Sequence, residues 1–211
     1  MSISLNKKTG INLKKGSSIS LEKQGKILEE VCFGLNWGAI QKKALFGLIS
    51  APQAVDLDGG VMMFDSANRK LDTVYFDKLI SNDRAIVHSG DDLEGDVGAD
   101  DGHDNEVIEI NLHKVAPDVQ QIVFYLHSYK GQDFASIPFS KIRIFEGNKN
   151  RVDDVLATLN LSADEAFAQK VTMILGKLVR TTNNWKFVAI GEPIDTHSLR
   201  EAVTIIQDQY L

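Results

Sequence analysis

The chain has 211 residues, of which 43% are hydrophobic and 25% are charged, and it carries a net charge of −6. This length predicts a single domain over residues 1–211, with a core large enough to fold without a disulfide or a metal. Cys32 is the one cysteine, so no internal disulfide can form, which favours a reducing compartment. The basic residues form no stripe with interleaved aromatics, which argues against a nucleic-acid surface.

Two further absences bear on where the protein resides. No run of the sequence approaches the roughly 18 apolar residues that a membrane-spanning helix needs. The segment from Met1 to Lys7 lacks the apolar centre of a signal peptide. We therefore expect a cytoplasmic protein.

Short segments rich in β-formers run along most of the chain. Apolar and polar residues alternate on either side of Thr9-Gly10, which predicts an opening β-hairpin. Gly59-Gly60 interrupts one of the later segments, and Ser162–Gln169 is rich in Ala, Asp and Glu, a composition that also allows a helix to begin there. The expected strands lie at 31–40, 55–64, 71–76, 85–88, 107–112, 121–127, 141–145, 155–161, 171–179 and 185–190.

The chain ends in an amphipathic pattern. Asp195 or Thr196 can cap a helix whose apolar residues fall on one face: Leu199, Ala202, Val203, Ile206 and Tyr210. Short strands separated by turns, with no βαβ alternation, predict a mainly β fold. We expect an antiparallel β-sandwich with a C-terminal helix and short helical segments.

The acidity of the chain is concentrated in one segment. Eight acids and no lysine or arginine lie between Asp91 and Glu106, whereas the remaining residues hold 21 acids and 23 bases. Flanking strands would confine these carboxylates, and two unit charges about 4 Å apart repel by roughly 1 to 4 kcal/mol. Such crowding favours a bound cation, and hard oxygen ligands suit calcium. A solvated acidic insertion is the alternative interpretation.

A second acidic element is Asp56-Leu57-Asp58. Residues two apart in a strand share a face, so both carboxylates can point at one ion. The following Gly59-Gly60 permits a bulge or the close approach of another loop. Surface carboxylates without a ligand are the simpler alternative.

Several motifs, in this order, resemble the tellurium-resistance TerD/TerZ family of stress proteins. The resemblance covers nearly the whole chain and is most specific over residues 1–146. The motifs are Ser4-Leu5, Gly34-Leu35-Asn36-Trp37, Val55-Asp56-Leu57-Asp58, Thr73-Val74-Tyr75-Phe76, Ile86 to Asp96, and Asp104-Asn105-Glu106-Val107-Ile108.

The resemblance implies a calcium-binding β-sandwich with two ions held between the first acidic element and the acidic loop. It implies a cytoplasmic stress function that includes tolerance of tellurite. Separately, we expect protein partners, with a membrane-protein complex as one candidate. The ligands expected from the resemblance and from the composition of the loop are Asp56, Asp58, Asp91, the Leu93 carbonyl, Asp96, Asp100, Asp104 and Glu106.

Three functions compete for these features. The first is a calcium-dependent binding module without enzymatic activity. The second is a metal-dependent hydrolase that uses the acidic cluster, although no nucleophile–base pair beyond His88-Ser89 accompanies the acids. The third is a calcium-dependent membrane-docking module, in which Lys42–Ile49 places apolar residues beside two lysines.

Overall fold

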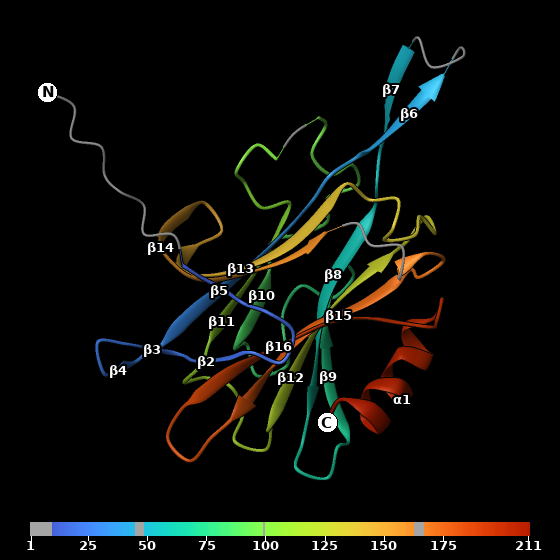
Figure 1. Ribbon diagram of the computed structural model, residues 1–211. Coiled ribbons are helices and arrows are strands. Elements are labelled where there is room, and N and C mark those ends of the chain that lie inside the picture. Colours follow the sequence, from blue (N-terminus) through green and yellow to red (C-terminus); the bar gives the residue numbers. More distant parts are fainter. Residues whose placement is uncertain (1–9, 45–48, 99, 163–166) are drawn as a thin grey trace, which may run out of the picture.

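The computed structural model describes residues 10–44, 49–98, 100–162 and 167–211. Its architecture is two six-stranded sheets that face each other, with one helix on the outside (Figure 1). The first sheet has the strand order β1 (Ile11–Asn12), β14 (Arg151–Ser162), β13 (Phe139–Asn148), β5 (Glu30–Trp37), β11 (Glu106–Asn111) and β10 (Ile86–His88). The second has the order β2 (Ser18–Ser20), β16 (Trp185–Ile194), β15 (Thr172–Arg180), β12 (Gln121–Ser128), β8 (Leu57–Phe64) and β9 (Lys70–Val74).

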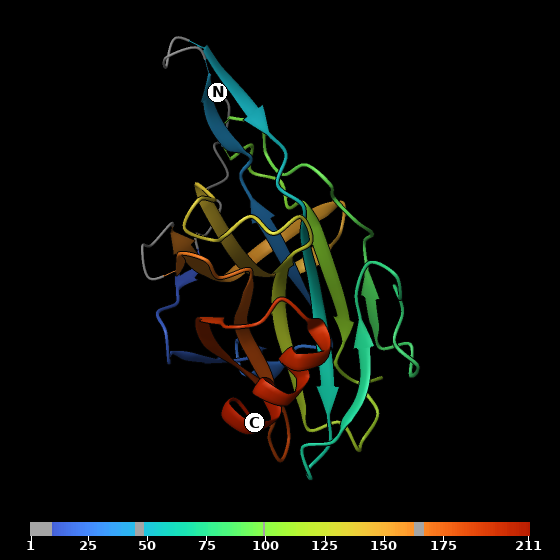
Figure 2. The same ribbon diagram turned by 90° about the vertical axis from the view of Figure 1, so that its right-hand side faces the viewer.

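Within these sheets all neighbouring strands are antiparallel except β1, which pairs with β14 in parallel. The expected opening hairpin falls mostly on residues 1–9, outside the described ranges. Two small hairpins complete the strands: β3 (Glu22–Lys23) with β4 (Lys26–Ile27), and β6 (Ile40–Ala44) with β7 (Ile49–Gln53). The β6–β7 hairpin projects from one end of the sandwich (Figures 1 and 2).

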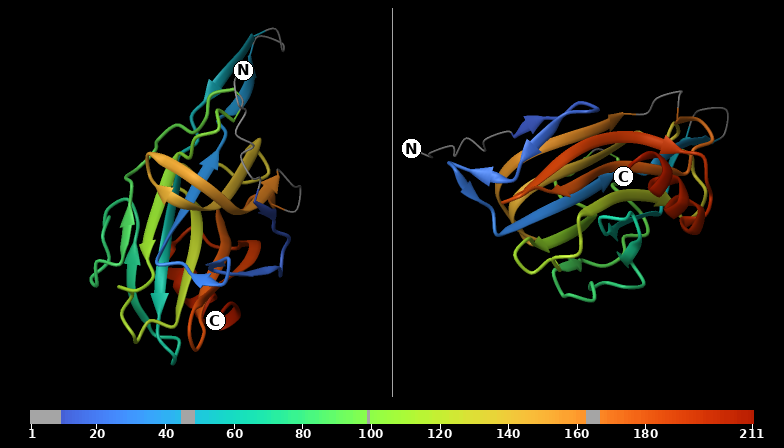
Figure 3. Two further views of the ribbon diagram at one scale, coloured as in Figure 1. Left: turned by 90° about the vertical axis from the view of Figure 1, so that its left-hand side faces the viewer. Right: turned by 90° about the horizontal axis from the view of Figure 1, so that it is seen from below.

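The main core lies between the two sheets, because alternate residues of each strand turn inward. Phe33 of the first sheet packs on Phe124 and Phe187 of the second, with ring centroids 4.1 and 5.5 Å apart. Figure 3 shows the sandwich from two further sides. The predicted antiparallel β-sandwich is therefore confirmed.

The helix α1 (Leu199–Gln209) packs on the outer face of the second sheet (Figure 2). Ala202 and Ile206 are buried against β8, β12 and β15, as the amphipathic pattern predicts. The predicted cap is wrong, because Ser198 precedes the first helical residue. Thr196 instead accepts a hydrogen bond from the Ser198 amide and donates one to Glu201.

Two further sequence expectations concern the glycine pair in β8 and a helix near residue 162. The Gly59-Gly60 pair does not break its strand, since β8 runs without interruption from Leu57 to Phe64. The stretch in which a helix was expected to begin lies partly outside the described residues, and α1 is the one α-helix in the described ranges. No helix in those ranges is long and apolar enough to cross a membrane.

Candidate metal centre

The acidic segment joins β10 to β11 and is fastened to the ends of two other strands. The Val55 amide, just before β8, donates a hydrogen bond to the Glu94 carbonyl at 2.9 Å. Asp96 forms a two-way backbone contact beyond β5, donating to the Trp37 carbonyl at 2.9 Å and accepting from the Ala39 amide at 2.8 Å. These bonds bring the acidic segment against the start of β8.

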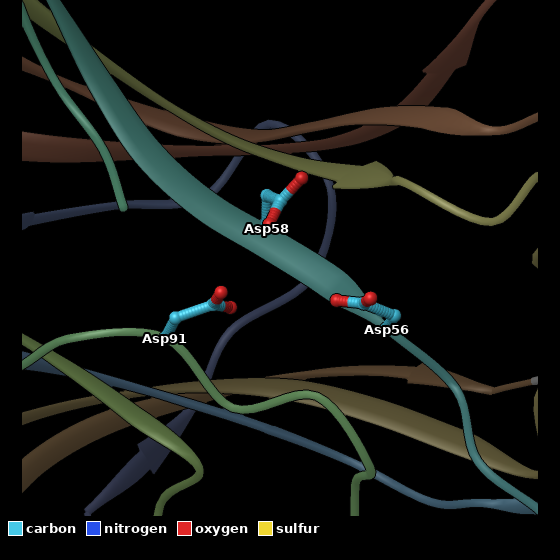
Figure 4. A group of neighbouring side chains, drawn as sticks. All are labelled: Asp56, Asp58 and Asp91. Carbon is cyan, nitrogen blue, oxygen red and sulfur yellow. The ribbon is translucent and has the colours of Figure 1, made fainter. Parts of the chain in front are cut away.

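Three carboxylates converge where the segment meets β8 (Figure 4). Asp56 directly precedes β8, Asp58 is the second residue of β8, and Asp91 comes from the facing loop. One oxygen of each lies within 4.8 Å of the others. Asp56 and Asp58 are buried, whereas Asp91 is exposed. Asp58 and Asp91 are 33 residues apart in the sequence. The two acidic elements nevertheless form one group in the fold.

The buried oxygens of this group are incompletely paired. Oδ1 of Asp56 and Oδ2 of Asp58 are shielded from solvent and have no hydrogen-bond partner among the described residues. Lys130 Nζ lies 3.1 Å from the other Asp56 oxygen and is itself about half exposed. Buried carboxylate oxygens without partners are energetically costly, and a proton, a hydrogen-bond donor or a cation would each relieve that cost.

The electrostatics of the group agree with this interpretation. Burial raises the pKa of Asp58 to about 7, and the neighbouring charges of Asp56, Asp91 and Glu106 add to the effect. Burial and the Asp56 charge also raise the pKa of Asp91. Without a cation, these like charges disfavour ionisation of the whole group.

Glu106 supports the group from the space between the sheets. Its Oε2 accepts a hydrogen bond from the Gly59 amide at 2.8 Å, and its Oε1 accepts one from the Asp92 amide at 3.4 Å. Nε2 of the buried His88 lies 3.4 Å from Oε2, while Nδ1 of the same ring accepts from the Gly90 amide at 3.1 Å. Burial raises the pKa of Glu106, and His88 offsets part of that rise.

A second group of carboxylates lies farther along the loop. Asp96, Asp100 and Asp101 each offer an oxygen within 4.8 Å of the other two. Asn36 and Asn105 donate hydrogen bonds to the two oxygens of Asp96, both at 3.3 Å. This group borders a cavity of about 590 Å³ lined by Asp91, Asp92, Leu93, Glu94, Gly95, Asp96, Val97, Asp101, His103, Asp104 and Asn105.

The loop backbone is shaped by its glycines. Gly90, Gly95, Gly98 and Gly102 all have positive φ, between 70° and 114°, as a tightly wrapped loop requires. At Gly95 a side chain would also collide with the ring of Trp37. The loop therefore depends on glycine both for its conformation and for its contact with the sandwich.

Comparison with known proteins identifies the family. Residues 9–204 match the TerD domain. The chain belongs to the TerD family. It is 32% identical over 182 residues to the tellurium resistance protein TerZ of Serratia marcescens, covering 86% of this chain and 89% of that protein. It is 29% identical over 206 residues to the stress response protein SCP2 of Bacillus subtilis, covering 92% and 98%.

The fold agrees with that of a solved structure. The crystal structure of a homologue of the telluride resistance protein TerD from Streptomyces coelicolor A3(2) superposes with a TM-score of 0.63. That match has 16% sequence identity and covers 85% of this chain and 98% of the other. The TerD resemblance seen in the sequence is confirmed.

The ligands expected from the TerD resemblance and the loop composition lie in several places in the structure. Asp56, Asp58 and Asp91 form the first group, and Asp96 and Asp100 belong to the second. Leu93 lies in the wall of the loop cavity, and Glu106 lies behind the first group at the Gly59 amide.

Asp104 and Asp101 differ from the sequence expectation. The buried Asp104 carboxylate forms an ion pair with Arg143 at 2.7 Å and is in neither group. Burial raises its pKa, while Arg143 acts in the opposite direction. Asp101 was not singled out as a ligand, yet it joins Asp96 and Asp100. Its membership of the acidic run was the only available signal.

The donor set suits one class of cation. Both groups consist of carboxylates in the part of the chain that the structure describes. Hard oxygen donors on a flexible, glycine-rich loop are the ligands that calcium prefers. Together with the unpaired oxygens of Asp56 and Asp58, the residues present fit a calcium ion.

Proposed function

We propose that this TerD-family protein binds two calcium ions at the acidic end of its sandwich and serves as a binding module in the cytoplasm. One observation carries the proposal: Asp56, Asp58 and Asp91 converge from two distant segments, with buried oxygens that have no partner among the described residues. A cation would neutralise this group and tie the loop to β8.

Each carboxylate group would hold one ion. Asp56, Asp58 and Asp91 would supply the first, and Asp96, Asp100 and Asp101 the second. A lysine lies at each group, Lys130 at Asp56 and Lys141 at Asp100. The groups differ in burial, because Asp56 and Asp58 are buried with unpaired oxygens whereas Asp100 and Asp101 are exposed. We therefore expect the first site to bind calcium more tightly than the second.

The role that we propose is recognition without catalysis. His88, the histidine of the His88-Ser89 pair, has a fully buried side chain that faces Glu106. Its neighbour Ser89 accepts a hydrogen bond from the Val107 amide at 2.9 Å through its hydroxyl. His88 and Ser89, the possible base and nucleophile, both contact groups inside the fold. These contacts support a structural role for the two residues.

The module would act by presenting an ordered surface to a protein partner. Calcium would fix the loop that carries the exposed side chains of Leu93 and Val97. The names of the relatives place their functions in tellurium resistance and the stress response. We extend those functions to this chain, with a membrane-protein complex as the expected assembly.

Calorimetric titration of the chelator-treated protein with calcium tests the proposal. We expect saturable binding with two sites and a higher melting temperature, because a ligand of the native state stabilises it. The double change of Asp56→Asn and Asp58→Asn should remove the tighter site. Changing Asp118→Asn and Asp208→Asn removes the same charge at two exposed positions and should leave both sites intact.

Absence of heat and of a melting shift at millimolar calcium would overturn the proposal. Equal loss of binding in the Asp118 and Asp208 variant would also contradict it. In that case general charge, and not the converging group, would be responsible.

A further inference from the structure

A second cavity of about 590 Å³ lies between α1 and the β8–β9 ribbon. Its lining residues come from β8, from β9 and the residues just after it, from β12 and from the first half of α1. The helix lies on the outer face of the second sheet (Figure 2). The apolar wall of the cavity consists of Met62, Leu71, Tyr75, Tyr125, Leu199 and Val203. Volumes of roughly 300 to 1,000 Å³ are typical of sites for small organic molecules.

The polar lining of this cavity is cationic. Lys70, Lys78 and Arg200 contribute three positive charges, and Asp72 contributes one negative charge. Lys78 forms an ion pair with Asp72, so that carboxylate is already neutralised. Lys70 and Arg200 form no ion pair among the described residues, and both are exposed. The cavity is therefore locally positive on a chain whose net charge is −6.

The aromatic lining carries a further sign of an incomplete site. Tyr125 is fully buried, and its hydroxyl has no hydrogen-bond partner among the described residues. The same is true of Thr73 Oγ1, which belongs to a second residue of the lining. Buried hydroxyls without partners are uncommon in folded proteins and call for an explanation.

The first turn of α1 borders the cavity and contains the acidic Glu201 as well as Arg200. Leu199 and Arg200 line the cavity, and the N-cap residue Ser198 makes no side-chain hydrogen bond to the turn. The amino end of a helix carries a partial positive charge that favours anions. This partial charge has the same sign as the charges of Lys70 and Arg200.

We infer that this cavity binds a small aromatic anion, a planar ring that bears one carboxylate, sulfonate or phosphate group. The ring would lie against the apolar wall and the two tyrosines, where aromatic rings pack favourably. The anionic group would lie at the mouth between Lys70 and Arg200. This site shares no lining residue with the acidic loop cavity, so we expect it to bind its ligand in the absence of calcium.

Anilinonaphthalene sulfonate is a suitable probe, because it joins an aromatic body to one sulfonate and fluoresces in apolar surroundings. We expect saturable binding to one site on the folded protein in a calcium chelator. The paired change of Lys70→Glu and Arg200→Glu should weaken binding about tenfold or more, since two attractive charges become repulsive. Neutral anilinonaphthalene should bind the wild-type protein more weakly than the sulfonate.

Two further variants make the test specific. Leu71→Trp at the partly exposed rim should fill the cavity and reduce binding of both probes. Lys26→Glu with Lys186→Glu makes the same change in charge at exposed positions away from the cavity and should leave the affinity unchanged. Circular dichroism and melting temperature establish that each variant is folded.

The inference is overturned if neither the Lys70 and Arg200 pair nor Leu71→Trp alters the affinity for the sulfonate. It is also overturned if the Lys26 and Lys186 pair weakens binding as strongly. Binding that responds to Leu71→Trp alone would contradict the preference for an anion.

Discussion

The backbone amide of Gly59 donates a hydrogen bond of 2.8 Å to the carboxylate of Glu106, joining the two sheets beneath the first carboxylate group. Gly59 lies on β8 next to Asp58, and Glu106 begins β11 at the end of the acidic loop. A side chain at position 59 would collide with Leu35 and would approach Glu106 Oε2 to 2.6 Å. Glycine thus permits the contact that positions the acidic loop over β8.

Gly59→Ala should therefore destabilise the protein through steric overlap between the sheets. We expect a loss of about 2 to 3 kcal/mol in the free energy of unfolding, measured by urea denaturation. Gly16→Ala is the control, because it has nothing within 4 Å and adds only the strain of a positive φ of 79°. That strain is about 1 kcal/mol. Equal losses in the two variants would contradict the steric explanation.

Sequence periodicity was sufficient to predict the sandwich but not the course of β8. The alternation of apolar residues predicted most of the core strands, including β12 almost to its ends. Gly59-Gly60 suggested a break, because glycine weakens an isolated strand. The structure pairs β8 with β12 on one side and β9 on the other, and ladder hydrogen bonds on both edges maintain its extended form.

The candidate site was only partly predictable for a related reason. The period of two in a strand places Asp56 and Asp58 together, and the family resemblance suggested their partner in the loop. Within a glycine-rich run of acids no period exists, so the sequence could not distinguish Asp101 from Asp104. The partner of Asp104 is Arg143 on β13, which is 39 residues away and gives no local signal.

The pH dependence of the calcium-free protein should reveal the strain at Asp58. Its folded pKa of about 7 lies above the ordinary value of 3.8, so its ionised form is penalised in the folded state. Its contribution to stability is thus fully present below pH 3.8 and is lost as the pH rises through about 7. Asp58→Asn should remove this loss.

We expect Asp58→Asn to stabilise the chelator-treated protein at pH 8 by on the order of 2 kcal/mol. The same variant should gain less stability than wild type when calcium is added. Urea unfolding from about pH 4 to about pH 8, with and without calcium, measures both effects. Parallel pH profiles for wild type and variant would contradict the raised pKa.

Tyr125→Phe tests whether the buried hydroxyl is truly unpaired. The ring packs in the cluster beneath α1, and its hydroxyl has no partner among the described residues. Removing an unsatisfied buried hydroxyl should raise the free energy of unfolding by about 1 kcal/mol. Tyr210→Phe is the matched control, since its hydroxyl donates a hydrogen bond of 3.0 Å to Glu192. That change should lower the free energy of unfolding, and a loss in both variants would show that Tyr125 has a partner.

The Arg143–Asp104 ion pair anchors the end of the acidic loop to β13. Both side chains are largely buried, and Asp104 lies against the bare backbone of Gly34. Arg143→Met would leave a buried carboxylate without its cation and should lower the free energy of unfolding by about 3 kcal/mol. Adding Asp104→Asn to that variant should recover most of the loss, because the uncompensated charge is removed.

The same pair separates anchoring from metal binding. Asp104→Asn should change calcium affinity far less than Asp91→Asn, since Asp91 belongs to a converging carboxylate group and Asp104 does not. Calorimetric titration of the two variants makes the comparison at equal net charge. A larger loss of affinity in Asp104→Asn would mean that this carboxylate leaves Arg143 to bind the ion, and the loop would then have two arrangements.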